Sequence, residues 1–119
     1  MTATAVTDLA PQIYEKAVAE TRTIEVNMSG KLRADELLTG TPTVTVSPSG
    51  LTLGSPTIST DAMMAVDAKG RVALVDAGKV IIVSASAGAA DAEYTITVIC
   101  STDATPAQVV RGRARLNVV

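Results

Sequence analysis

The stretch DAEYTITVICST, Asp91–Thr102, decides the fold class because apolar and polar side chains alternate along it. Alternation with a period of two is typical of a β-strand with one buried face. Four side chains suited to a core fall together on one face: Tyr94, Ile96, Val98 and Cys100. The opposite face holds Thr95, Thr97, Ile99 and Ser101. The stretch therefore predicts a core β-strand.

Short segments with the same period recur from Thr23 to the C-terminus. Turn residues separate them at intervals of roughly ten positions, which is the spacing of a β-sandwich. The clearest segments are TIEVNMSG, TPTVTVSPSG, KVIIVSAS and VVRGRARLNVV. No helical period long enough for a βαβ unit lies between them. We predict one domain over residues 22–119, an all-β, immunoglobulin-like antiparallel β-sandwich of about seven or eight strands.

The middle of the chain contains two further strand signals. In MMAVDAKGRVALVDAG, residues 63–78, turn residues separate Val and Leu runs, and this pattern predicts an extra hairpin. The segment KVIIVSAS, residues 79–86, is almost continuously apolar at its start. Such a run is expected of a strand that is covered on both faces.

Residues 1–21 are predicted to form an extended N-terminal arm with one helical turn at most. They are small and polar, and Pro11 interrupts them. An arm of this kind is either floppy or holds a neighbouring chain. We find no basic leader and no apolar stretch near the ~20 residues that span a bilayer. We therefore expect synthesis in the cytoplasm, without a signal peptide or a membrane partner.

The composition indicates a folded chain with a thin core. Of the 119 residues 47% are hydrophobic, yet Phe and Trp are absent. Because aromatic side chains bury the most area, the lack of Phe and Trp favours stabilisation by neighbours, as in a homo-oligomer or a symmetric array. The net charge of -2 and the scarcity of aromatic residues argue against nucleic acid as a partner.

Cys100, the only cysteine, is either a nucleophile or a core side chain. A reactive thiol requires a base, usually His, or a positive environment, and the chain contains no histidine. The same absence excludes a Ser-His-Asp triad and disfavours a zinc site. We predict that Cys100 is packing, and that the chain has no catalytic residue, no metal and no cofactor. An enzyme or a carbohydrate binder is the least favoured class.

Tyr94 and three arginines are also singled out by their positions. Tyr94 opens the core strand, which is typical of a tyrosine corner, where the phenol bonds to backbone a few residues upstream. Arg111, Arg113 and Arg115 share one face of the last strand. They either guard a sheet edge, which is the favoured interpretation, or form a docking stripe for an acidic surface. In the second interpretation they are the candidate partner contacts.

A family resemblance rests on four segments taken in order: TRTIEVNMSGKL, TPTVTVSPSGLTLGSPTIS, KVIIVSASAGAADAEYTITVICST and VVRGRARLNVV. They resemble a group of small immunoglobulin-like virion proteins of tailed bacteriophages, encoded among head, connector and tail genes and including fibre–tail adaptors. Three features are typical of that group. They are a strand followed by a Pro-Ser-Gly turn, a strand in which tyrosine follows a glycine, and a final basic strand. Here they fall on Val44–Thr52, Gly88–Cys100 and Arg111–Val118.

The resemblance implies a non-enzymatic structural protein that connects or decorates head, neck, tail or fibre components in many copies. Its partners would be other virion proteins, and its location would be the virion after synthesis in the host cytoplasm. Two alternatives stay open. One is a capsid decoration protein specifically; the other is a cell-surface immunoglobulin-like adhesion module, which would need an export signal.

Overall fold

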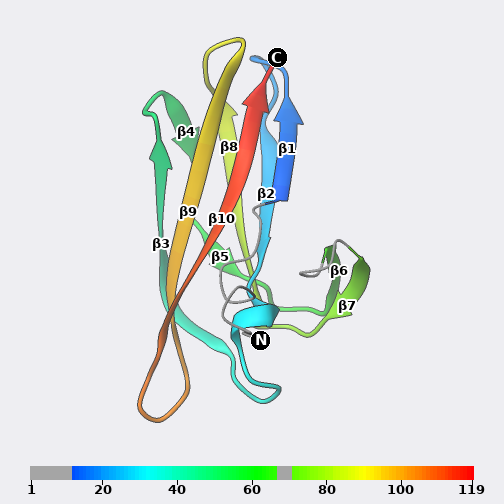
Figure 1. Cartoon of the computed structure of the whole chain (residues 1–119), viewed down its shortest axis with the longest axis vertical. Coiled ribbons are helices and arrows are strands. Elements are labelled where there is room, and N and C mark those ends of the chain that lie inside the picture. Colours follow the sequence, from blue (N-terminus) through cyan, green and yellow to red (C-terminus); the bar gives the residue numbers. More distant parts are fainter. Residues whose placement is uncertain (1–11, 67–70) are drawn as a thin grey trace, which may run out of the picture.

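The structure is a computed structural model that describes residues 12–66 and 71–119 (Figure 1). These residues form β-strands and one short 3-10 helix, which confirms the predicted all-β class. The elements in chain order are β1 (Gln12–Lys16), β2 (Arg22–Asn27), η2 (Ser29–Lys31), β3 (Leu38–Ser47), β4 (Leu51–Leu53), β5 (Thr57–Ile58), β6 (Met63–Val66), β7 (Val72–Val75), β8 (Val80–Ala87), β9 (Ala92–Thr102) and β10 (Val109–Val118).

Two sheets make up the body of the molecule, and a small third sheet lies to one side (Figure 1). The first sheet has the strand order β1-β10-β9-β3. The second has the order β2-β8-β4, and β5 also pairs with β8. All of these pairs are antiparallel except the parallel pair of β1 and β10. The described chain is therefore a β-sandwich, as the spacing of the turns predicted.

The core lies between the two main sheets and follows the alternation of the Asp91–Thr102 stretch. Along β9, Tyr94, Ile96, Val98 and Cys100 are all buried, as predicted. The opposing sheet contributes Ile24 and Val83, which are at most 1% exposed. Most of these side chains are β-branched or small, so the core is built from aliphatic contacts around one buried tyrosine.

The third sheet is the predicted extra hairpin, formed by β6 and β7. Its inner face, with Ala65 and Val75, packs on Val80 of β8. Ile82, which points away from the main core, is packed against the same small cluster. The nearly continuous apolar run of β8 is thereby explained, because the sandwich covers one face of its first half and the hairpin covers the other.

Ser59 ties the two ends of the hairpin insertion together. Its backbone N–H donates to the Val80 carbonyl oxygen at 2.8 Å, and the Gly78 N–H donates to the Ser59 carbonyl oxygen at 2.8 Å. The buried Ser59 hydroxyl also accepts from the N–H groups of Gly78 and Val80, at 3.2 and 3.3 Å. The chain therefore leaves and re-enters the sandwich at one place, which we call the neck of the hairpin: the hydrogen-bonded residues Ser59, Gly78 and Val80.

Part of the predicted N-terminal arm is a strand of the sandwich. Residues 12–16 form β1, which pairs with Ala114–Val118 of β10, whereas residues 1–11 of the predicted arm lie outside the described residues. Tyr14 of β1 joins the two sheets, because its hydroxyl donates to the Glu25 carbonyl oxygen at 2.8 Å and accepts from the Glu25 N–H at 3.1 Å. The boundary between arm and sandwich at residue 21 therefore does not mark a structural break.

Candidate partner-binding surface

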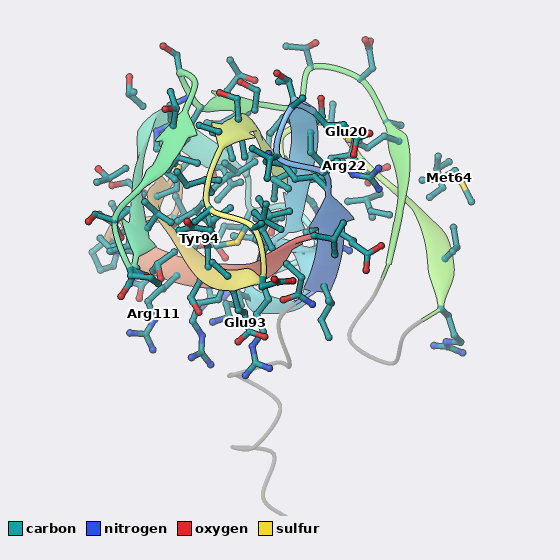
Figure 2. All side chains as sticks on the ribbon, turned by 90° about the horizontal axis from the view of Figure 1, so that it is seen from above. Glu20, Arg22, Met64, Glu93, Tyr94 and Arg111 are labelled. Carbon is teal, nitrogen blue, oxygen red and sulfur yellow. The ribbon has the colours of Figure 1, made fainter. Side chains whose placement is uncertain are left out.

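The three arginines lie on the outer face of the four-stranded sheet because β10 alternates strictly. Ala114, Leu116 and Val118 point inward and are buried. Arg111 and Arg115 are exposed on the opposite face, and Arg113 between them is half-buried. Figure 2 shows Arg111 pointing away from the sandwich. The shared face predicted from the sequence is therefore confirmed.

Gly112 allows β10 to lie close to the second sheet. A Cβ at this position would be 2.6 Å from the Met28 sulfur and 2.8 Å from Cγ1 of Val26. Only a residue without a side chain fits between Arg111 and Arg113 at this separation of the sheets. The arginine row therefore sits on a strand that is held tightly against the core.

Hydroxyl groups line the strands beside the arginines. In the ladder, Arg113 lies opposite Thr97 and Arg115 lies opposite Thr95. One strand further, Thr45 lies opposite Thr97 and Ser47 lies opposite Thr95. Hydroxyl groups both donate and accept hydrogen bonds, so this part of the face can bond to the backbone or side chains of a partner.

The charges of this face are uneven along its length. The cross-strand partners of the three arginines on β9 are Thr and Ile residues, without a carboxylate. Carboxylates appear only in the last row, where Asn117 lies between Glu15 and Glu93. Within residues 12–66 and 71–119, Arg111 and Arg115 have no ion-pair partner. The face therefore presents positive charge over most of its length in a chain whose net charge is -2.

Aliphatic side chains complete the surface. Ile13 of β1 lies opposite Arg115, and Ile99 of β9 lies opposite Arg111. Both are exposed, and so is Val109 at the start of β10. A flat mixture of arginine, aliphatic and hydroxyl side chains is typical of protein interfaces, in which arginine is enriched.

The edge-guarding interpretation of the arginines fits only part of the strand. β1 pairs with Ala114–Val118, so Arg115 lies in an inner strand with a neighbour on each side. Arg111 and Arg113 lie beyond the end of β1, where the described part of β10 has β9 as its only partner. Only half of the strand is an edge, because residues 12–16, predicted as arm, form β1 and pair with the other half.

Cys100 and Tyr94 have the packing roles that the sequence predicted. The Cys100 thiol is buried, donates to the Thr39 carbonyl oxygen at 3.4 Å, and has a raised pKa because burial disfavours the thiolate. The Tyr94 hydroxyl accepts from the Ala89 N–H at 2.9 Å, five residues upstream. Both side chains therefore serve the core and the corner that leads into β9.

Sequence reasoning missed two buried charged residues, Lys16 and Glu36, and the half-buried Tyr14. Lys16 is almost fully buried, and its ammonium group donates to the carbonyl oxygens of Ala17 and Val18 at 2.8 and 3.2 Å. Burial raises the pKa of Tyr14, against the opposing effect of its bond to Glu25. Glu36 is buried near the start of β3, and its carboxylate accepts from the Arg33 N–H at 3.0 Å. Only the alternation of QIYEK, which places Tyr14 and Lys16 on one face, signals two of them in the sequence.

Among residues 12–66 and 71–119, no group of three or more His, Cys, Asp or Glu side chains is placed to hold a metal ion. No helix in this part of the chain has the length and apolar character needed to cross a membrane. No protein-family model matches the chain, and no curated protein sequence matches it significantly.

Proposed function

We propose that this chain is a non-enzymatic structural protein of a tailed-phage virion. It connects or decorates head, neck, tail or fibre components through protein–protein contacts in many copies. The observation that carries the proposal is the outer face of the β1-β10-β9-β3 sheet, where a row of arginines stands beside hydroxyl rows and exposed aliphatic side chains. Such a face suits a stable contact with another protein better than it suits chemistry on a small molecule.

The strand order supports the immunoglobulin-like part of the proposal. An immunoglobulin-like sandwich has three neighbouring strands of one sheet, second, fifth and fourth in order, facing third, sixth and seventh. The order β2-β8-β4 against β3-β9-β10 corresponds to it once the inserted hairpin is set aside. The bond from the Ala89 N–H to the Tyr94 hydroxyl corresponds to the tyrosine corner of that fold.

The chemistry of the face favours an acidic protein partner. Arg111 and Arg115 each offer a planar set of donors that bind a carboxylate in a bidentate manner. Arginines at every second position of a strand are about 7 Å apart, so they match carboxylates on an extended or flat surface. Nucleic acid is the weaker fit, because no aromatic side chain stands among the arginines for bases to stack on.

The test has two steps. Mass spectrometry of purified particles of the phage that encodes the chain should detect it in many copies, and its absence from virions would overturn the proposal. In the second step, Arg111→Ala/Arg115→Ala should reduce incorporation into particles at least about tenfold, as loss of interface charge pairs does. The control Arg22→Ala/Arg33→Ala removes the same charge at two exposed positions outside this face and should incorporate normally. Equal incorporation of both variants would exclude the arginine face, which is the outer face of the β1-β10-β9-β3 sheet, as the contact.

Cryo-electron microscopy of the same particles separates the roles within the virion. Density for the sandwich on the capsid surface would identify a decoration protein. Density at the neck, the tail or the fibre base would identify a connector or adaptor. In either position, the outer face of the β1-β10-β9-β3 sheet should lie against a surface that carries carboxylates.

A further inference from the structure

The β6–β7 hairpin carries an exposed apolar face. Met64 is 57% exposed, Val72 is 64% exposed and Leu74 is 66% exposed. Met64 lies directly opposite Leu74 in the antiparallel ladder, and Val72 is two residues from Leu74, so all three share one face. In Figure 2 the Met64 side chain points away from the sandwich.

The hairpin is held firmly, although its outer face has no cover among the described residues. Its inner face packs on Val80, and the Ser59 hydrogen bonds close its neck. A two-stranded hairpin by itself is only marginally stable in water, and a second apolar layer stabilises it. β8 supplies such a layer on the inner face, and no residue of 12–66 or 71–119 covers Met64, Val72 and Leu74 on the outer face.

The charges that the structure describes around the hairpin are arranged so that two copies complement each other. β6 and β7, MMAV and VALV, contain no charged residue. Asp61 and Asp76 lie at the neck, and Arg71 lies next to β7 at the opposite end. If two hairpins pack face to face about a two-fold axis perpendicular to their strands, the neck of each copy faces the far end of the other. Arg71 makes interactions within its own chain, and its five donors also leave room for a carboxylate of a second copy.

We propose that this face binds the same face of a second copy of the chain. A two-fold interface is self-complementary, and an apolar patch with opposite charges at its two ends meets that requirement. The patch is small, because a stable dimer uses about 20–30 residues on each side. The contact is therefore weak for a single pair and strong only where many copies are held together. The inference does not rest on the virion assignment, since a dimer forms through this face whatever the chain's place in the cell.

Sedimentation over a range of concentrations tests the contact directly. A dissociation constant of about 1 mM puts about half of the chains in dimers at about 1 mM protein. The weight-average mass should then rise above the monomer mass of 12.1 kDa. The triple variant Met64→Thr/Val72→Thr/Leu74→Thr retains strand propensity and should stay monomeric. The control Val18→Thr, at a residue that is 45% exposed in the turn between β1 and β2, should behave as the wild type.

Cross-linking provides a second measurement that does not require a stable dimer. Leu74→Cys and Val18→Cys are made in a Cys100→Ala background, so that each chain has one exposed thiol. A short bismaleimide that spans the ~10 Å between packed sheets should give at least about ten times more dimer for Leu74→Cys than for Val18→Cys. Equal yields, together with a wild type that stays monomeric at about 1 mM, would overturn the proposal.

The results also separate this proposal from the proposed function. Dimers that the threonine variant abolishes support the hairpin contact even if the chain is absent from virions. A monomeric chain whose threonine variant fails to enter virions would show that another virion protein occupies this face, and it would refute the second copy as the occupant.

Discussion

Gly112 lies where β10 comes closest to the opposite sheet, so adding one methyl group there tests how the sheets pack. Gly112 is paired with Val98, and both positions face the core. The added Cβ of Gly112→Ala would stand 2.6 Å from the Met28 sulfur and 2.8 Å from Cγ1 of Val26. Nonbonded carbon atoms prefer separations of about 3.5–4.0 Å, so the neighbours or the backbone must move by about 1 Å.

The cost of Gly112→Ala depends on which neighbour yields. Met28 is unbranched and can change its rotamer, whereas Val26 is stiff at its first side-chain torsion. Both are buried, so neither can turn into solvent. Overpacking of a core typically costs about 1–3 kcal/mol, and the stiff valine places this substitution near 2 kcal/mol, as an order of magnitude.

Urea unfolding followed by circular dichroism measures the effect. The midpoint should fall while the slope m stays constant. Ser101→Thr adds a methyl group on the exposed face of β9 and should change the unfolding free energy by less than about 0.5 kcal/mol. In a Val26→Ala background, where the contacted methyl group is gone, Gly112→Ala should cost about 1 kcal/mol less. A Gly112→Ala protein as stable as the wild type, or strict additivity with Val26→Ala, would refute the close approach of the sheets.

Three further predictions concern single side chains. Tyr94→Phe removes the acceptor of the Ala89 N–H and should lower the unfolding free energy by about 1 kcal/mol; an unchanged urea midpoint would contradict it. Cys100 is buried with a raised pKa, so a thiol reagent should modify the folded chain at least about a hundredfold more slowly than the urea-unfolded chain, and equal rates would disprove the placement. The bond from the Arg33 N–H lowers the pKa of Glu36 below 4.5, so its contribution to stability is present above that pH and is lost as the pH falls through the folded-state pKa. Glu36→Gln should therefore weaken the loss of stability in acid, and identical pH profiles of the two proteins would count against this role.

The hairpin and the arginine face differ in the partner chemistry that they offer. The arginine face is charged and hydroxyl-rich, and its partner in the proposed function is another protein with carboxylates. The hairpin face is apolar, and its proposed partner is a second copy. The hairpin packs on the outer side of β8, in the sheet opposite the arginines, so the two contacts lie on different sheets of the sandwich. A chain with both contacts can bind an acidic partner protein and a neighbouring copy at once, as a repeating array requires.

Alternation was sufficient to predict most of the strands and their buried faces. Tyr94 and Cys100 of β9 point inward as the period of two required, and the three arginines of β10 share the outer face. The hairpin was also predictable, because its turn residues separate two apolar runs. These features depend on residues that are close together in the chain, so a local sequence pattern is enough to predict them.

Pairing between distant segments could not be predicted in the same way. Lys16 and Tyr14 were assigned to an arm, because a strand as short as β1 has little pattern of its own and is defined by its partner β10. The apolar run of β8 indicated two covered faces, but it did not identify the hairpin as the second cover. Gly112 has no periodic signal, and its role follows only from the positions of Val26 and Met28 in the other sheet.

The amino-acid sequence alone determined that the chain forms an antiparallel β-sandwich, and which side chains of its clearly periodic strands, Tyr94 and Cys100 among them, enter its core. Each of these follows from residue type and a period of two, which are properties of a single strand. Only the tertiary structure decided which strands are neighbours. It placed hydroxyl groups rather than carboxylates beside Arg113 and Arg115, and it left the outer face of the hairpin uncovered. These outcomes depend on contacts between residues far apart in the chain, because the surface of a sheet is made by its neighbours and not by any one strand.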